Sequence, residues 1–154
     1  LAGTSFTLVG LWWTVIERRP VWRSDPVRRR LAGGTYLSFL LPGLMATFAQ
    51  ISPGTPLLWR VSFGACALVG LASTTQLLTL DRATAHPGPF RRFRWVAALL
   101  YLAILVLGVA PELVRGLGLT PLTVGGVLLV LLVILGHGLT WDFLMEPEPP
   151  VEAH

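Results

Sequence analysis

The sequence contains no lysine and a single cysteine, and charged residues of either sign are scarce. All twelve basic residues are Arg, and a lone cysteine, Cys66, excludes an intrachain disulfide. Charged residues make up 13% of the 154 positions, against about 25% in typical soluble domains. Because so few charges cannot cover a soluble globule, we expect much of the surface to face lipid. The absence of lysine is typical of a GC-rich bacterial genome.

Motifs of enzymes are also missing. The chain has no phosphate-binding Walker loop, dinucleotide fingerprint, zinc-ligand spacing or membrane-protease motif. Asp81 with His86 and the nearby Arg residues is the one group that could bind a phosphate, through bidentate Arg geometry. A role of these charges in orienting the chain explains them better. We therefore expect no enzymatic activity, no bound metal and no cofactor.

Long apolar runs dominate the rest of the sequence, separated by short gaps that contain proline or arginine. A helix needs about 20 apolar residues to cross a bilayer. The runs predict an all-α integral membrane protein, a bundle of five transmembrane helices at residues 1–16, 31–51, 57–80, 95–110 and 119–141. The first run is short, so four spans and one interfacial helix are the alternative. We expect residues 142–154 to form an acidic, proline-rich cytoplasmic tail after a transmembrane domain at 1–141.

The arginines predict the orientation in the membrane. Ten of the twelve basic residues fall in two loops, and positively charged loops stay in the cytoplasm. This places the N-terminus outside and the C-terminus inside a cell inner (plasma) membrane. We also expect these side chains to bind anionic lipid headgroups. They are Arg18, Arg19, Arg23, Arg28, Arg29, Arg30, Arg82, Arg91, Arg92 and Arg94. The pI near 10.6 does not indicate nucleic acid, because no soluble domain presents the clusters to a duplex.

The second apolar run contains Pro42 and Gly43 near its middle, which predicts a kink or a local break. Unwound backbone at membrane depth occurs only inside protein or along a cavity. This is therefore the first place to look for a bound ion or small polar ligand, with Ser38 and Gln50 on the same segment. Close helix packing at Gly34, Ser38 and Pro42 is the alternative interpretation.

The third run carries Ser62, Cys66, Ser73 and Gln76 at spacings of four, seven and three, which places them on one helical face. They indicate either a wetted cavity or ion path, or hydrogen bonds between packed helices. The second interpretation is favoured because hydroxyl and thiol groups can bond to the preceding turn.

Two charged or titratable residues remain near the ends of the spans. Arg60 either extends to the headgroups beside Trp59 or attracts anions to the mouth of a pore. His137 is a candidate pH-responsive group, although an interfacial position explains it as well.

Two function classes fit these observations. One is an ion channel or transporter-like pore that works as a homo-oligomer, with the second or third span lining the path and arginines favouring anions. The other is a non-catalytic accessory or scaffold subunit of a larger membrane complex, whose acidic tail docks on a basic surface of its partner. The oligomeric state in a bilayer distinguishes the two.

Overall fold

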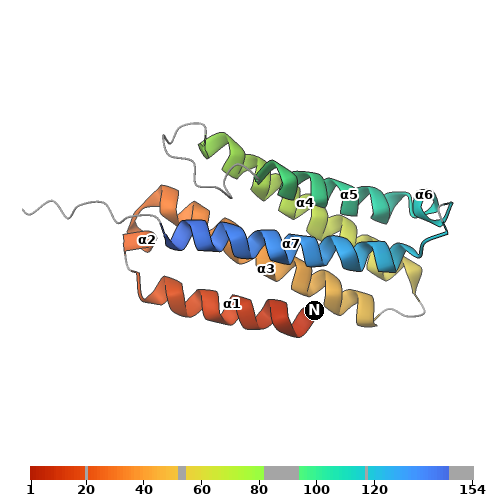
Figure 1. Ribbon diagram of the computed structural model, residues 1–154, viewed down its shortest axis with the longest axis horizontal. Coiled ribbons are helices and arrows are strands. Elements are labelled where there is room, and N and C mark those ends of the chain that lie inside the picture. Colours follow the sequence, from red (N-terminus) through yellow and green to blue (C-terminus); the bar gives the residue numbers. More distant parts are fainter. Residues whose placement is uncertain (20, 52–54, 82–93, 117, 146–154) are drawn as a thin grey trace, which may run out of the picture.

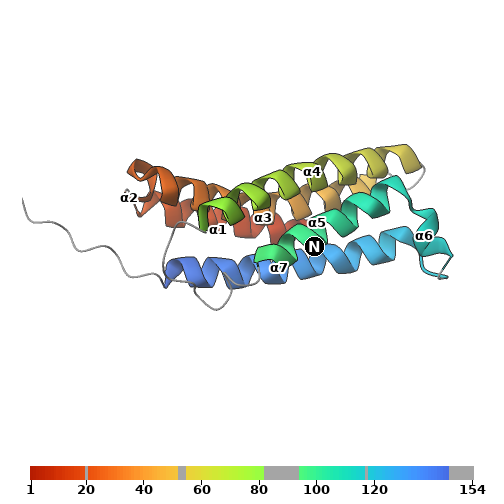
Figure 2. The same ribbon diagram turned by 90° about the horizontal axis from the view of Figure 1, so that it is seen from above.

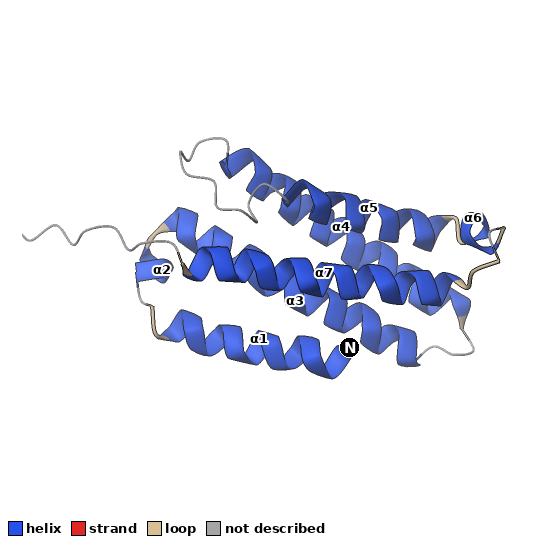
Figure 3. Cartoon of the chain, in the orientation of Figure 1, coloured by secondary structure: helices blue, strands red, loops and turns tan. Residues whose placement is uncertain are grey.

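The computed structural model is a bundle of helices (Figures 1 and 3). It describes residues 1–19, 21–51, 55–81, 94–116 and 118–145, and no strand occurs within these ranges. The helices are α1 (Ala2–Glu17), α2 (Val21–Ser24), α3 (Pro26–Ile51), α4 (Pro56–Asp81), α5 (Arg94–Val109), α6 (Glu112–Arg115) and α7 (Pro121–Leu144). The predicted all-helical architecture is therefore confirmed.

Three of the described helices are long and apolar enough to cross a membrane. Their apolar parts are Pro26–Ile51, Pro56–Thr79 and Pro121–Asp142. At about 1.5 Å per residue, each exceeds the hydrocarbon thickness of about 30 Å. α5 is a shorter apolar helix of 16 residues, and α1 has the same length. The chain thus fits a small helical membrane protein, and the predicted total of five spans stays a prediction.

The longest helices begin earlier or end later than the apolar runs alone predicted. α3 starts at Pro26 and so takes three arginines from the first basic loop. Proline costs little at the first helical position, and the Asp25 side chain caps the helix by accepting from the Val27 N–H at 2.8 Å. α7 starts in the same way, with Thr120 as its cap and Pro121 after it. It continues to Leu144, so the predicted tail is helical at first; residues 146–154 lie outside the described part.

Pro42 and Gly43 do not interrupt α3. The backbone stays helical from Pro26 to Ile51, so the predicted local break is wrong. Both residues are buried, because α1 packs against α3 at this point. A Cβ atom on Gly43 would lie 3.0 Å from the Ser5 Cβ atom. The missing side chain therefore serves close helix packing, which was the alternative interpretation of this segment.

One end of the bundle gathers the arginines. α1 and α4 flank α3, and α7 packs on both α3 and α5. Figure 2 shows α7 on one side of α1, α3 and α4, with α5 passing between α7 and α4. The C-terminal ends of α1, α4 and α7 and the N-terminal end of α3 lie together, on the left of Figure 1. We call this the arginine end, because it carries Arg18, Arg19 and Arg28 to Arg30. The other end of the bundle is called the opposite end.

α5 does not reach the arginine end. Its 16 residues extend about 24 Å, while the 26 residues of α4 extend about 39 Å. The N-terminus of α5 lies well inside the ends of α4 and α7 in both views (Figures 1 and 2). The first residue of α5 is therefore placed within the bundle rather than at its surface.

Two apolar clusters fill the bundle. The larger one occupies the half nearer the opposite end and includes Met45, Phe63, Ile104 and Leu129, each no more than 2% exposed. The smaller one, at the arginine end, joins α1, α2 and α3. Here the Trp12 indole N–H donates to the Ala32 carbonyl at 3.0 Å, and the Trp12 and Trp22 rings lie 5.9 Å apart.

Candidate functional site: a polar chamber between four helices

A small cavity lies where the two apolar clusters meet. It is lined by residues of α3, α4, α5 and α7 and has a volume of about 50 Å³. Since one water needs about 10–15 Å³ on this measure, the cavity has room for a few water molecules or a small ion. Among the described residues, its polar lining comprises Thr35 and Ser38 from α3, Ser73 and Thr74 from α4, and Arg94 and Tyr101 from α5. We call this cavity the polar chamber.

Three of the hydroxyl groups in the lining already donate hydrogen bonds to their own helix. Thr35 donates to the Leu31 carbonyl at 3.2 Å, and Ser38 to the Thr35 carbonyl at 2.7 Å. Thr74 donates to the Gly70 carbonyl at 2.7 Å. These bonds satisfy the protons and leave only lone pairs toward the chamber.

The other two hydroxyl groups keep their protons available. Ser73 and Tyr101 have no hydrogen-bond partner within the described part of the chain, although Tyr101 is only 3% exposed. The Tyr101 ring lies against Gly70, where a Cβ atom would overlap the ring. Gly70 thus fixes the position of Tyr101 at the wall of the chamber. Each of these hydroxyls can donate to an acceptor inside.

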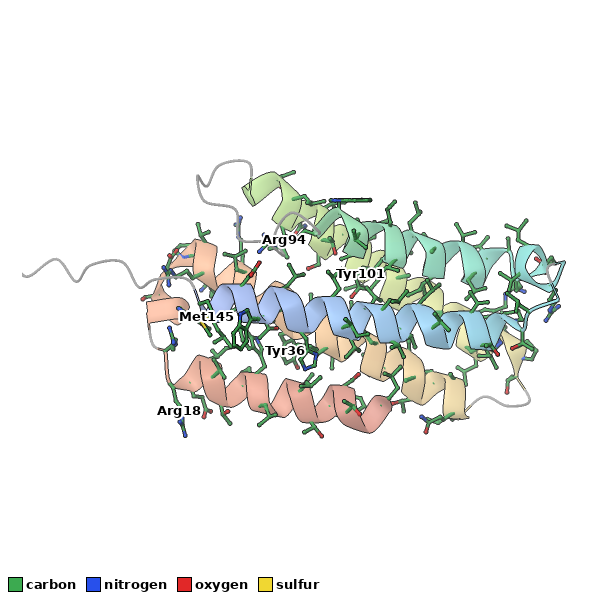
Figure 4. The ribbon with its side chains drawn as sticks, viewed as in Figure 1. Arg18, Tyr36, Arg94, Tyr101 and Met145 are labelled. Atoms are coloured by element: carbon green, nitrogen blue, oxygen red, sulfur yellow. The ribbon has the colours of Figure 1, made fainter. Side chains whose placement is uncertain are left out.

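Arg94 adds a positive charge to the lining. It is 8% exposed, because α5 begins inside the bundle. Arg94 and Tyr101 are seven residues apart, which puts them on one face of α5, and Figure 4 shows both between α5 and α7. Charged residues inside a membrane are costly and usually face a cavity that holds ions or substrate. Together with the free hydroxyl protons, this charge suits an anion or another oxygen-rich acceptor.

The chamber differs from the predicted set of site residues. Of that set it brings together Ser38 and Ser73, from two different helices. Arg94, assigned from the sequence to the headgroup-binding arginines, is buried at the chamber instead. Neither the second-span segment around Pro42 nor the third-span stripe lines it as a whole.

The remaining residues of the third-span stripe are dispersed. Ser62 is buried and donates to the Trp59 carbonyl at 3.0 Å. Cys66 is half-buried against the larger apolar cluster. Gln76 is exposed. The buried face of α4 instead follows Trp59, Phe63, Ala67, Gly70 and Thr74, about one residue further round the helix than predicted.

Three further candidates lie away from the chamber. Gln50 is exposed near the opposite end of α3. The His137 ring packs edge-on to Phe39 at 5.4 Å, and its Nδ1 atom lies 3.1 Å from the Val133 carbonyl. The Arg60 guanidinium binds two carbonyls at the end of α5, those of Gly108 and Val109, each at 2.8 Å. Arg60 therefore caps the C-terminus of α5.

Sequence reasoning did not select Thr35, Thr74 or Tyr101. Thr74 directly follows Ser73 and lies on the stripe of buried α4 residues. Tyr101 could have been found by its separation of seven residues from Arg94, had Arg94 been expected inside the bundle. The missing information was the depth at which α5 starts.

A larger hollow opens on the outside of the bundle between α3 and α4. It has a volume of about 640 Å³ and is lined by Arg30, Gly33, Gly34, Tyr36, Leu37, Ser73, Gln76, Leu77 and Thr79. We call it the lateral groove. Ser73 lines both the groove and the chamber. Gly34 and Leu77, which contact each other, also line both.

The arginines predicted to meet headgroups have mixed environments. Arg18, Arg29 and Arg30 are exposed at the arginine end. Arg28 lies 3.7 Å from the Asp25 carboxylate, and Arg19 lies 5.0 Å from the centre of the Trp22 ring. Arg82, Arg91 and Arg92 lie outside the described residues, and Arg23 is placed only by its backbone in α2.

Comparison with protein-family models, with curated proteins and with solved structures finds no match for this chain. The fold defines the class of protein: a small bundle with three helices that fit a membrane. Its function has to be inferred from the chemistry of the chamber and the groove.

Proposed function

We propose that this protein is a multi-pass membrane protein of the plasma membrane that binds a small anion in the polar chamber and moves it across the bilayer. The supporting observation is that the buried Arg94 lines the chamber together with Ser73 and Tyr101, whose hydroxyl protons are not used within the described part of the chain. These three residues, from two helices, line a space large enough for a small ion. Guanidinium and hydroxyl donors together favour chloride or an anion of similar size.

The packing favours a carrier-like mechanism over an open pore through one chain. Apolar side chains fill the half of the bundle nearer the opposite end, where Met45 and Ile104 are fully buried. A solute that leaves the chamber toward that end therefore meets this apolar cluster of described residues. Release of the anion on that side would need a rearrangement of the apolar cluster. If the chain crosses the membrane five times with the arginine end in the cytoplasm, the chamber is nearer to the cytoplasmic side.

The test is anion uptake into proteoliposomes, together with the rise in melting temperature caused by anions in detergent. We expect Arg94→Gln to lower anion affinity by at least about tenfold, since charge-assisted hydrogen bonds contribute about 1.5–3 kcal/mol, and to abolish uptake. Arg94→Lys keeps the charge and should retain part of the binding.

Arg29→Gln is the matched control, because Arg29 is exposed and does not line the chamber. It should leave uptake and anion stabilisation unchanged. Equal uptake by wild type, Arg94→Gln and empty liposomes would contradict the proposal, as would a melting temperature that no anion raises in the wild type.

The second candidate, an accessory subunit, is favoured by the outer face of α1. Gly3 and Gly10 are seven residues apart, and no atom lies within 4 Å of a Cβ built on either. Glycines on an outward face let a partner helix approach closely. Under this alternative, a stoichiometric partner should co-purify from native membranes, and Gly3→Leu with Gly10→Leu should release it. Anion binding would be unaffected by those substitutions.

A further inference from the structure

We infer that the lateral groove binds one anionic phospholipid from the leaflet at the arginine end, with the phosphate on Arg30 and an acyl chain along α3 and α4. This goes beyond the proposed function, since the groove lies outside the chamber and its occupant is a lipid rather than a transported ion. The groove holds about 640 Å³, enough for a headgroup and the start of a chain but far more than a small ion needs.

The groove faces the side of the bundle that lipid would cover. Among the described residues, those of α3 and α4 line it, and no other described helix contributes to its wall. On α3, Arg30, Gly33 and Leu37 recur at helical spacing, and on α4, Ser73 and Gln76 do the same. Each helix therefore contributes one continuous face, which is polar toward the arginine end.

Two exposed polar side chains in the groove lack partners within the described part of the chain. Arg30 and Gln76 are exposed, and neither makes a hydrogen bond or ion pair within the described part of the chain. A bare carboxamide or guanidinium against hydrocarbon is costly. A phospholipid supplies what both lack, because its phosphate oxygens accept from a guanidinium and its ester carbonyls accept from a carboxamide N–H.

Charge at the mouth of the groove selects an anionic lipid. Arg29 and Arg30 are both exposed and form no ion pair with another described residue, while Arg28 lies beside the Asp25 carboxylate. A zwitterionic headgroup would bring its own cation close to this excess positive charge. A lipid whose headgroup carries only the phosphate charge, such as phosphatidylglycerol, avoids that repulsion.

Gly33 provides the space for the lipid. No atom lies within 4 Å of a Cβ built on Gly33, whereas one built on Gly34 would overlap the Leu77 side chain. The absence of a side chain at position 33 thus leaves the groove open, while Gly34 permits contact between the two helices. A leucine at position 33 would project into the groove without displacing neighbouring atoms.

The experiment is native mass spectrometry of the full chain released from nanodiscs that contain equal amounts of phosphatidylglycerol and phosphatidylcholine. We expect one phosphatidylglycerol to stay bound per chain in preference to phosphatidylcholine. Arg30→Gln should weaken retention about tenfold through loss of the charge-assisted bonds, and Gly33→Leu should abolish it by filling the groove.

Two variants serve as controls. Gly126→Leu makes the same exchange at an α7 position that also has open space around it, and Arg18→Gln removes an exposed arginine away from the groove lining. Both should retain the lipid. Equal retention of the two lipids, or loss of lipid in the controls as much as in the groove variants, would overturn the inference. Arg30→Gln should still take up anions, since this substitution does not alter the chamber lining. Loss of lipid retention with normal anion uptake therefore distinguishes the lipid site from the proposed function.

Discussion

Arg60 illustrates how a charged side chain in an apolar helix can bind the backbone of a neighbouring helix. Its guanidinium donates from Nε to Gly108 and from a terminal nitrogen to Val109. Helices leave their last carbonyls without partners, and Pro111 just beyond the helix has no N–H to offer. The charge of Arg60 also lies at the negative end of the α5 dipole, where cations are stabilised. One residue therefore joins the start of α4 to the end of α5.

Replacing Arg60 should destabilise the bundle. We expect Arg60→Ala to lower the free energy of unfolding by about 1–3 kcal/mol, because two charge-assisted hydrogen bonds are lost and two carbonyls are left exposed to an apolar surrounding. Arg60→Lys should recover only part, since an ammonium lacks the planar fork that reaches both oxygens. The measurement is unfolding in mixed detergent micelles followed by circular dichroism, with Arg115→Ala as the control. If both alanine variants unfold alike, the carbonyl contacts contribute nothing.

At the scale of helices, contact between α4 and α5 depends on glycines that admit a ring or a backbone. Gly70 receives the Tyr101 ring, and a Cβ on Gly108 would lie 3.3 Å from the Arg60 carbonyl oxygen. Close backbone approach of this kind is how small residues promote association in membranes. The position of Tyr101 in the chamber wall is thus a consequence of helix packing, rather than of its own hydrogen bonds.

Two glycine-to-alanine substitutions should differ in cost. Gly70→Ala should destabilise by about 1–3 kcal/mol, because the new methyl group meets a rigid aromatic ring. Gly34→Ala should cost less than about 1 kcal/mol, because the atom it meets is the end of the flexible Leu77 side chain. Unfolding in mixed micelles measures both. The double variant Gly70→Ala with Tyr101→Ala should relieve the clash, and a double variant whose loss equals the sum of the single losses would contradict this mechanism.

At the scale of the whole molecule, the two ends are chemically different. Exposed arginines and the groove lie toward the arginine end, the chamber lies where the two apolar clusters meet, and apolar side chains fill the half nearer the opposite end. Trp13 of α1 and Trp141 of α7 are both more than half exposed near the arginine end, as aromatic residues are at a membrane–water interface. Because tryptophan is enriched at both interfaces, only the exposed arginines favour the cytoplasmic side for this end.

Cysteine labelling tests this orientation. In a Cys66→Ser background, Arg18→Cys lies at the arginine end and Gly116→Cys at the opposite end, and both positions are exposed. We expect a membrane-impermeant maleimide to label position 116 on intact cells, and position 18 only after the membrane is permeabilised. Labelling of position 18 on intact cells would reverse the assignment, and labelling of both would show that the chain does not separate them across a membrane.

Hydropathy was sufficient to locate α3, α4 and α7 within a few residues, because lipid imposes both their length and their composition. It could not place the chamber. Whether Arg94 lies at a surface or inside depends on the depth at which α5 starts beside α4. The face of α4 that is buried depends likewise on α3 and α5, so a stripe chosen from spacing alone included Ser73 but missed Thr74. Both are relations between segments far apart in the sequence.

Ser73 borders the chamber and the groove at once. With a solute on one side and a lipid on the other, its single proton can be donated to only one of them at a time. By thermodynamic reciprocity, any factor by which the lipid changes the affinity for the ion must equal the factor by which the ion changes the affinity for the lipid. The composition of the surrounding leaflet would then act as an effector of this protein.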